Sequence, residues 1–250
     1  MGNQSKVIID VDSYLYKAAC MCSELIQIDE NIYYEGYDIR KAKNFITDTI
    51  SNLMGKTNTS DYVLVTGGYG KNFRYTIDSN YKSNRRATKK PIMLDIVKKM
   101  VMDNFNVAYI PHLEADDTCR ILYERKEGSM VVSLDKDLCT FEVKLYDPYH
   151  DKVRVVTPQQ AEANFKRQLL MGDTADGYSG IPKIGKATAD KLILEGITID
   201  EIAEMYVEKG LGLEEFTRTY NLAKILGKDD YRDGVITLYG GTKLDTRTLE

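Results

Sequence analysis

The chain of 250 residues has few residues that could build a zinc site or a histidine-dependent nucleophile. None of its four cysteines forms a Cys-X-X-Cys pair, and its two histidines do not stand at zinc-finger spacing. This pattern argues against a zinc framework and against a serine or cysteine triad. We therefore expect Cys20, Cys22, Cys119 and Cys139 to be buried, reduced thiols in a cytoplasmic protein.

Long apolar segments are also missing. No run approaches the roughly 20 residues that a membrane span needs, and the N-terminus leads into a strand without a signal-peptide pattern. We expect a soluble protein that has no membrane partner.

Charge is distributed unevenly along the chain. The formal net charge is −4, yet residues 71–90 carry seven Lys or Arg side chains against a single acid, Asp78. The sequence therefore combines a local basic patch with an acidic remainder, and acidity alone does not exclude a nucleic-acid partner.

Nine acidic residues fall in four short clusters. The clusters are Asp10 with Asp12; Glu114 with Asp116 and Asp117; Asp135 with Asp137; and Asp173 with Asp176. The first and third follow β-branched runs, so we expect them where strands end. Crowded carboxylates repel one another unless cations neutralise them. Mg²⁺ or Mn²⁺ would suit these oxygen ligands, and a two-metal hydrolase is the first hypothesis.

Each cluster also has a simpler structural explanation. Asp12 could cap a helix that begins near Ser13. The acidic side chains of residues 114–117 could stabilise the first turn of a helix by interacting with the positive end of its dipole. Asp173 and Asp176 could be ordinary loop and cap residues. Metal binding is favoured because four separate clusters occur in one chain.

The apolar periodicity predicts an α/β core followed by a helical region. Strands are predicted at residues 6–10, 62–66, 107–110, 130–133, 144–146 and 153–156, and helices at 13–25, 39–54, 92–105 and 114–125. This alternation predicts a mainly parallel sheet with helices on both faces, and such sheets bind ligands beyond the carboxyl ends of their strands. From residue 158 short helices and glycine turns follow, so we expect domains at 1–157 and 158–250. Residues 228–250 give no clear pattern.

Residues 180–187 have the glycine and lysine spacing of a nucleotide-binding P-loop. However, Ala187 stands where that loop needs Ser or Thr, and no strand precedes the segment. We favour a glycine-containing hairpin between two short helices, with backbone N–H groups that face a phosphate backbone.

Six segments, in order along the chain, resemble the 5′-nuclease family. They are residues 9–18 (IDVDSYLYKA), 70–74 (GKNFR), 81–85 (YKSNR), 114–117 (EADD), 133–137 (SLDKD) and 171–176 (MGDTAD). The family includes phage 5′-3′ exonucleases, flap endonucleases and the 5′-nuclease domain of bacterial DNA polymerase I. The resemblance implies a PIN-like core, a helical arch within residues 71–90, and a C-terminal helix-three-turn-helix module that grips duplex DNA.

The resemblance also implies roles for individual residues. One Mg²⁺ would be held by Asp10, Glu114, Asp116 and Asp117, and a second by Asp135, Asp137, Asp173 and Asp176. Catalytic contacts to the scissile phosphate would come from Lys71 and Arg74. The threaded 5′ strand would meet Tyr81, Lys82, Arg85 and Arg86, although Tyr81 could equally pack against its own helix. The hairpin would contact duplex DNA and would also hold a K⁺ ion through its backbone carbonyls. The DNA-binding residues of the hairpin would be Gly180, Ile181, Lys183, Gly185, Lys186 and Thr188.

The chain departs from the family pattern at Gly67. The family usually has another metal-site Asp at this position, and it more often has a small residue where Asp12 stands. We hypothesise that Asp12 restores the lost negative charge. Gly177 likewise replaces a family Asn after Asp176.

The function implied is two-metal-ion hydrolysis of DNA at 5′ ends or 5′ flaps, in replication or repair. A monomer acting on branched or 5′-ended duplex DNA is expected, and RNA-primed DNA is a further candidate substrate. Two alternatives are a PIN-type ribonuclease, against which residues 158–226 argue, and a structure-specific DNA-binding protein with weakened catalysis, which Gly67 suggests.

Overall fold

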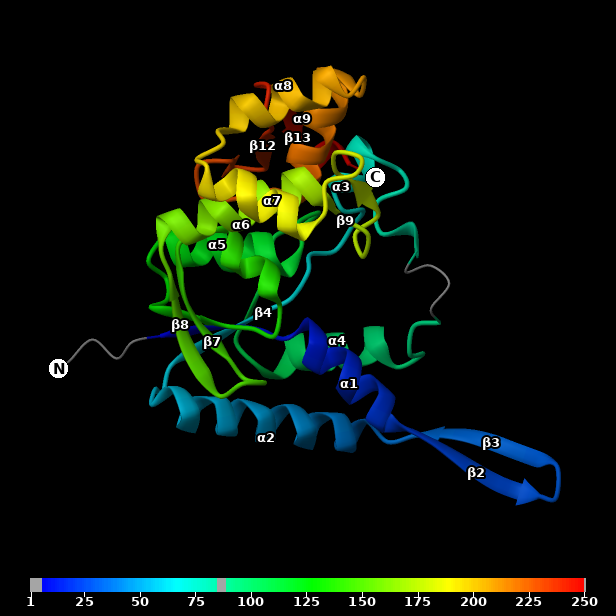
Figure 1. The fold of residues 1–250 in the computed structure, drawn as a ribbon. Helices are drawn as coiled ribbons and strands as arrows, with labels where there is room; N and C mark the ends of the chain where they lie inside the picture. The colour runs from blue at the N-terminus through cyan, green and yellow to red at the C-terminus, as the bar shows by residue number, and fades with distance from the viewer. Residues whose placement is uncertain (1–5, 85–88, 250) are drawn as a thin grey trace.

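A computed structural model describes residues 6–84 and 89–249, and its centre is a six-stranded sheet in the order β5-β4-β1-β6-β7-β8 (Figure 1). The strands are β1 (Val7–Asp10), β4 (Tyr62–Val65), β5 (Val107–Ala108), β6 (Met130–Val132), β7 (Val143–Asp147) and β8 (Lys152–Val156). Strand β1 pairs in parallel with both β4 and β6, and only β8 runs antiparallel to its neighbour. The prediction of a mainly parallel sheet is confirmed.

Helices cover both faces of the sheet because β1 is apolar on both sides. Val7 and Ile9 belong to a core formed with helices α1 (Asp12–Cys22), α2 (Ile39–Thr57) and α4 (Leu94–Asn104). Ile8 points to the opposite face, where it packs with α5 (Ala115–Glu124). All four residues of β1 are buried, as expected for a central parallel strand between two helical layers.

Two predicted helix ends were wrong. The first helix stops at Cys22 and does not reach residue 25, because Ser23 adopts an extended conformation. The second helix continues through Gly55 to Thr57. Its C-cap is Asn58, which has a left-handed backbone conformation and donates its N–H to the carbonyls of Met54 and Gly55. Asparagine tolerates that conformation better than most residues, so the helix did not need glycine as its stop.

A hairpin that was not predicted lies between α1 and α2. Strands β2 (Ser23–Asp29) and β3 (Ile32–Tyr37) pair antiparallel and project away from the rest of the molecule (Figure 1). The alternation of Ile26 and Ile28 with polar residues, followed by an Asp-Glu-Asn turn, was the signal that could have revealed it.

The C-terminal region consists of four helices, within the described residues, and several short strands. It contains α6 (Pro158–Met171), α7 (Lys186–Leu194), α8 (Ile199–Glu208) and α9 (Gly212–Ala223), with a short hairpin of β9 (Gly172–Asp173) and β10 (Tyr178–Ser179) after α6. Tyr206 and Phe216 are fully buried in the core of this region. Helix α6 joins the two regions, because Ala161 packs under the sheet while Leu169 and Leu170 pack among the C-terminal helices.

The last residues form a small antiparallel sheet that the sequence did not indicate. It consists of β11 (Tyr231–Arg232), β12 (Val235–Thr237) and β13 (Lys243–Asp245), followed by the 3₁₀ turn η3 (Thr246–Thr248). Ile236 of β12 packs with Phe73 and Ile121, so the tail is tied to the nuclease-like core.

The cysteines only partly follow the prediction. Cys22 and Cys119 are buried and Cys139 is half-buried, but Cys20 is exposed on α1. Within the described parts of the chain, no helix is both long and apolar enough to cross a membrane.

Candidate active site

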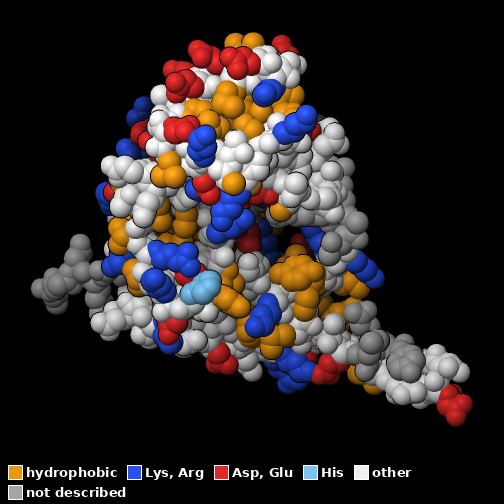
Figure 2. Space-filling model, in the orientation of Figure 1, with side chains coloured by type: hydrophobic (Ala, Val, Ile, Leu, Met, Phe, Trp, Pro, Cys, Tyr) orange, Lys and Arg blue, Asp and Glu red, His pale blue; other side chains and the backbone are white. Residues whose placement is uncertain are grey.

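A cavity of about 310 Å³ opens at the carboxyl ends of β1, β4 and β6. Five acids from three of the four clusters line it: Asp10, Asp12, Glu114, Asp116 and Asp135. Figure 2 shows a hollow near the middle of the molecule with acidic side chains inside it. The strand ends thus bring together acids that lie up to 125 residues apart, from position 10 to position 135.

Asp10 is the last residue of β1 and its side chain is almost fully buried. Its carboxylate accepts hydrogen bonds from Ser133 Oγ at 2.8 Å and from the backbone N–H of Asp12 at 3.1 Å. Burial, followed by the nearby charge of Asp12, raises the pKa of Asp10 to about 7. The folded protein therefore disfavours the ionised form of this carboxyl.

Asp116 lies in the first turn of α5 and faces the same cavity. Burial, together with the charges of Asp135 and Asp10, raises its pKa well above the usual range. A dication between these groups would offset both causes of the shift, because its charge favours the ionised carboxylates.

The carboxylates of the cavity are suitable ligands for a hard cation, although they do not surround a single point. Across residues 6–84 and 89–249, no group of three acidic, histidine or cysteine side chains is arranged to hold a metal ion. Mg²⁺ usually keeps several waters and is bound through one or two carboxylates, so it does not need a closed protein cage. Asp10, Asp116 and Asp135 offer the oxygen ligands that such an ion requires.

Asp12 does not cap α1, so that interpretation is corrected. Val11 occupies the N-cap position, no side chain caps the helix, and Asp12 is the first helical residue. Its carboxylate instead reaches the end of β4, where it accepts hydrogen bonds from Thr66 Oγ1 at 2.5 Å and from the N–H of Gly67. The side chain is thereby fixed at the edge of the cavity.

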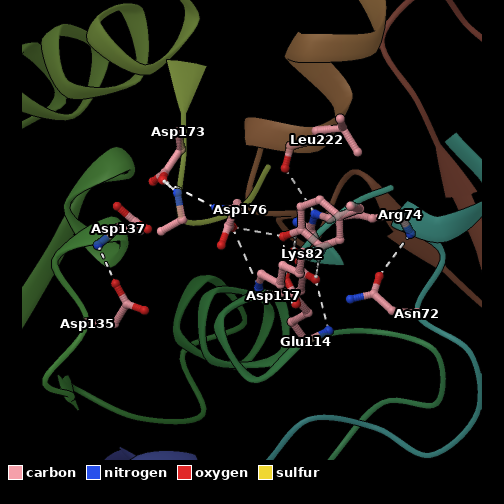
Figure 3. A network of polar contacts seen from close by, with 12 residues as sticks. Asn72, Arg74, Lys82, Glu114, Asp117, Asp135, Asp137, Asp173, Asp176 and Leu222 are labelled. Carbon is pink, nitrogen blue, oxygen red and sulfur yellow. Dashed lines mark hydrogen bonds and ion pairs between the residues drawn. The ribbon is translucent and has the colours of Figure 1, made fainter. Parts of the chain in front are cut away.

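Glu114 connects the cavity to the C-terminal region. It is the N-cap residue of α5, and Lys82 Nζ lies 2.5 Å from its Oε1 (Figure 3). The hydroxyl of Tyr81 lies 3.0 Å from both Glu114 Oε2 and Asp176 Oδ2. Burial opposes ionisation of Glu114, but Arg74 and Lys82 outweigh it and hold the pKa below its usual value.

Arg74 and Asp117 form a buried ion pair, which corrects both predicted roles. The guanidinium of Arg74 contacts the two carboxylate oxygens of Asp117 at 2.7 and 2.8 Å and also donates to the carbonyls of Leu222 and Lys224 (Figure 3). Arg74 is 2% exposed and Asp117 is fully buried. Arg74 does not itself line the cavity, but its guanidinium lies 3.3 Å from Oε2 of Glu114, which does. Both carboxylate oxygens of Asp117 are taken up by hydrogen bonds, so neither is free for a metal. A buried charge needs such partners to be stable.

The predicted gateway residues differ from one another in placement, and Lys82 lines the acidic cavity. Tyr81 is buried in the core of the C-terminal region, so it packs and is not an exposed stacking surface. Lys82 is paired with Glu114 and lies 3.6 Å from Asp176. Lys71 is exposed and its side chain does not line the cavity. Arg85 and Arg86 lie outside the described residues.

The remaining acids lie apart from the first cavity. Asp137 and Asp173 line a second hollow of about 340 Å³ together with Gln168, whose amide donates to Asp137 Oδ1 at 3.0 Å. Burial and the charges of Asp135 and Asp173 raise the pKa of Asp137 to about 6. Asp173 also accepts the backbone N–H of Ala175 in a local turn. The four acids predicted for a second metal are therefore neighbours but do not share one cavity.

His112 was not predicted as a site residue. It lines the first cavity, has a positive φ of 66°, and its Nδ1 lies 2.9 Å from the carbonyl of Lys71. Gly70 makes room for it, because a Cβ on Gly70 would lie 2.4 Å from the imidazole ring. A single histidine without metal spacing carries no signal in one sequence.

The predicted DNA-contacting hairpin is only partly available at the surface. Ile181 is buried among the C-terminal helices, and Gly180 packs so closely that a Cβ would lie 2.4 Å from Gly172 N. Both therefore have structural roles, and a contact of their backbone groups with DNA stays a prediction. The other members are exposed: Lys183, Gly185, Lys186 and Thr188. Gly185 is the N-cap of α7 and has open space around it.

Comparison with known proteins places this arrangement in a family. Residues 5–166 match the model described as 5′-3′ exonuclease, N-terminal resolvase-like domain. A 5′-3′ exonuclease of Buchnera aphidicola subsp. Schizaphis graminum is 28% identical over 73% of this chain and 67% of the relative. The exonuclease of Escherichia phage T7 is 25% identical over 83% of this chain and 73% of its own length.

Solved structures show the same fold. A bacteriophage T5 protein co-crystallised with metal ions superposes with a TM-score of 0.64 at 16% identity, covering 88% of this chain and 89% of the other. The T5 flap endonuclease in a pseudo-enzyme-product complex with DNA and metal ions gives a TM-score of 0.62 at 16% identity, over 88% and 89% of the two chains.

Proposed function

The chain belongs to the 5′-3′ exonuclease family with an N-terminal resolvase-like domain, and we propose that it is a structure-specific 5′ nuclease acting on 5′-ended or branched duplex DNA. The observation that carries the proposal is the cavity in which Asp10, Asp116 and Asp135 meet at the carboxyl ends of parallel strands. We propose that it acts as a monomer, in replication or repair.

The proposed cofactor is Mg²⁺, with Mn²⁺ as a substitute. When bound, such ions stabilise the charge on the reacting oxygens and lower the pKa of a coordinated water. Asp10, Asp116 and Asp135 would hold one ion, and Asp137 with Asp173 would hold a second on the side of α6. The raised pKa values of Asp10 and Asp137 support this, because burial and neighbouring carboxylates disfavour the ionised forms that a dication would favour.

Neighbouring residues would hold the cavity's carboxylates in position for this chemistry. Ser133 and the backbone N–H of Asp12 fix the carboxylate of Asp10, while Thr66 and Gly67 fix that of Asp12. Lys82 is the cation nearest to the acids, and as substrate enters it could exchange its contact with Glu114 for one with a phosphate. Arg74 would act indirectly, by holding α5 against the C-terminal helices through Asp117.

We further propose that the C-terminal helices hold the duplex. The exposed side chains of Lys183, Lys186 and Thr188 lie beside the N-terminus of α7, whose amides are not capped by a side chain. Helix N-termini with nearby lysines bind phosphates. A K⁺ ion held by backbone carbonyls of this turn would reinforce the contact.

One assay tests the proposal and separates it from both alternatives. A labelled 5′-flap duplex, a 5′-recessed duplex and a single-stranded RNA would each be incubated with the protein in Mg²⁺, in Mn²⁺ and in EDTA. We expect divalent-dependent cleavage of the duplexes. Cleavage of RNA alone would indicate a ribonuclease, and binding of the flap without any cleavage would indicate a DNA-binding protein that has lost catalysis.

A further inference from the structure

Gln168 lies in the last turn of α6 and contacts one of the acids proposed to hold the second cation. Its side-chain Nε2 donates to Asp137 Oδ1 at 3.0 Å, and both residues line the hollow of about 340 Å³ that also contains Asp173. We propose that Gln168 is a positioning residue for this cation, an inference that rests on the proposed function. It would act by fixing the direction of the Asp137 carboxylate.

The amide of Gln168 leaves one of its polar atoms unsatisfied. Oε1 is buried and accepts no hydrogen bond, and it is the one such side-chain nitrogen or oxygen among residues 6–84 and 89–249. A buried polar atom without a partner destabilises a folded protein. Turning the amide over would not remove this cost, because Oε1 would then face the carboxylate of Asp137 and both groups are acceptors. The contact with Asp137 therefore sets the orientation of the amide.

Packing alone does not explain a glutamine at this position. Methionine has a similar length and adapts to irregular spaces, so it would occupy the site without leaving a buried carbonyl oxygen. What methionine lacks is the N–H group that reaches Asp137. Glutamine thus provides a contact with a carboxylate at some expense of stability, which is typical of functional sites.

A different residue of α6 attaches this helix to the turn that carries Asp137. The turn is the 3₁₀ helix η2 (Lys136–Thr140). Asn164, one helical turn before Gln168, donates its Nδ2 to the carbonyl of Cys139 at 2.8 Å. Asn164 therefore holds the backbone of η2, whereas the contact of Gln168 is to a carboxylate.

Asp137 lies between the acids of the two hollows. Its backbone N–H donates to Asp135 Oδ1 at 2.8 Å, and Asp135 lines the first cavity. Asp173 lies on its other side, just beyond the C-terminal end of α6 (Figure 3). Hydrogen bonds from outer residues hold metal-binding side chains in place, and the loss of one commonly weakens metal affinity about 10–100-fold. We therefore expect Gln168 to influence the affinity for a divalent cation.

Magnesium titration of the protein without DNA is the first test. Gln168→Met removes both the donor to Asp137 and the unsatisfied carbonyl, so its melting temperature in EDTA should be no lower than that of wild type. Calorimetry should show that it binds Mg²⁺ about tenfold more weakly at one site. Gln159→Met makes the same substitution at an exposed position of α6 and is the matched control. Its Mg²⁺ affinity should equal that of wild type.

A double-mutant cycle tests whether Gln168 acts through Asp137. In an Asp137→Asn background, Gln168→Met should cause no further loss of Mg²⁺ affinity. Gln168→Leu serves for the same measurements if Gln168→Met does not fold. A further, additive loss in the double variant would overturn the proposal. A lower melting temperature of Gln168→Met with wild-type Mg²⁺ affinity would also overturn it, because the glutamine would then have only a structural role.

Cleavage of a 5′-flap duplex separates positioning from direct catalysis. Gln168→Met should raise the Mg²⁺ concentration for half-maximal cleavage about tenfold, with a rate close to wild type at saturating Mg²⁺ and an unchanged KM for DNA. If wild type cleaves no DNA but Gln168→Met weakens Mg²⁺ binding, the positioning role stands and the proposed nuclease function fails. If wild type cleaves DNA and the variant binds Mg²⁺ as wild type does, the positioning role alone fails.

Discussion

The N–H of Gly67 donates to both carboxylate oxygens of Asp12, at 3.3 and 3.2 Å, and a Cβ on Gly67 would lie 3.3 Å from Asp12 Oδ2. The two positions therefore share one space at the edge of the acidic cavity. A carboxylate attached at residue 67 would lie close to the one that Asp12 provides. This geometry supports the hypothesis that Asp12 supplies the charge that the family has at the position of Gly67.

The first prediction concerns moving this carboxylate from residue 12 to residue 67. Asp12→Ser should depress cleavage at limiting Mg²⁺, because a negative charge at the cavity edge is lost. The double variant with Gly67→Asp should recover activity, since the smaller serine leaves room for the new side chain. Gly67→Asp alone should be less stable than wild type, because two carboxylates would then repel at short distance. Full activity of Asp12→Ser at limiting Mg²⁺ would reject the compensation.

The second prediction concerns Asp116. Asp116→Asn should reduce Mg²⁺-dependent cleavage roughly 100-fold or more while leaving duplex affinity nearly unchanged. Asp103→Asn, which alters an exposed acid paired with Lys99 away from the cavity, is the matched control and should be active. Single-turnover rates and equilibrium binding would be measured for both. Wild-type turnover in Asp116→Asn would mean that the cavity is not the catalytic centre.

The third prediction separates stability from catalysis at Arg74. Arg74→Ala should lower the free energy of unfolding by about 3–5 kcal/mol, because it leaves the buried Asp117 charge without its partner. Lys71→Ala, at an exposed position, should change it by less than about 0.5 kcal/mol. Chemical denaturation measures both. A fully stable Arg74→Ala protein with impaired phosphate binding would restore the catalytic role for Arg74.

The fourth prediction addresses the turn before α7. Gly185→Asp should weaken duplex affinity about tenfold and reduce its salt dependence, because a negative charge would face the DNA phosphates. Gly185→Asn is the control of equal size without charge, and it should bind more tightly than Gly185→Asp. Fluorescence anisotropy at several salt concentrations gives both values. Equal affinity and salt slope for the two variants would argue against a duplex contact here.

The fifth prediction is a dependence of stability on pH in the absence of divalent cations. The pKa of Asp10 is raised from 3.8 to about 7 and that of Asp137 to about 6, so the folded protein holds protons that the unfolded chain has released. The free energy of unfolding should therefore fall as pH rises from about 4 to about 7. Mg²⁺ should reduce this fall, because it favours the ionised carboxylates.

Melting temperatures in EDTA and in Mg²⁺, at several pH values in this window, test the prediction. Asp10→Asn should flatten the dependence in EDTA, since it removes one of the groups with a raised pKa. A melting temperature in EDTA that rises through the window would contradict the assignment.

The family and the core of the fold could be predicted from sequence because their signals are local. The apolar run of residues 7–9 indicated a buried strand, and the acids that follow it indicated a ligand-binding strand end. The hairpin of β2 and β3 had a readable alternation, but its first three residues were assigned to the end of a helix and the rest to no element. The tail of residues 228–250 had no such pattern, because its three strands are only two or three residues long.

What the sequence determined by itself was which residue types stand near strand ends, and hence the family and the chemistry of the cavity. Which charges pair with one another was decided only by the tertiary structure. Arg74 contacts Asp117, which is 43 residues away in the sequence, and the carbonyl of Leu222, which is 148 residues away. We expected Arg74 to bind a phosphate, but in the structure it forms a buried ion pair. Such ion pairs depend on how the helices of the two regions pack together and bury a charged side chain, because a buried charge is stable only beside its partner.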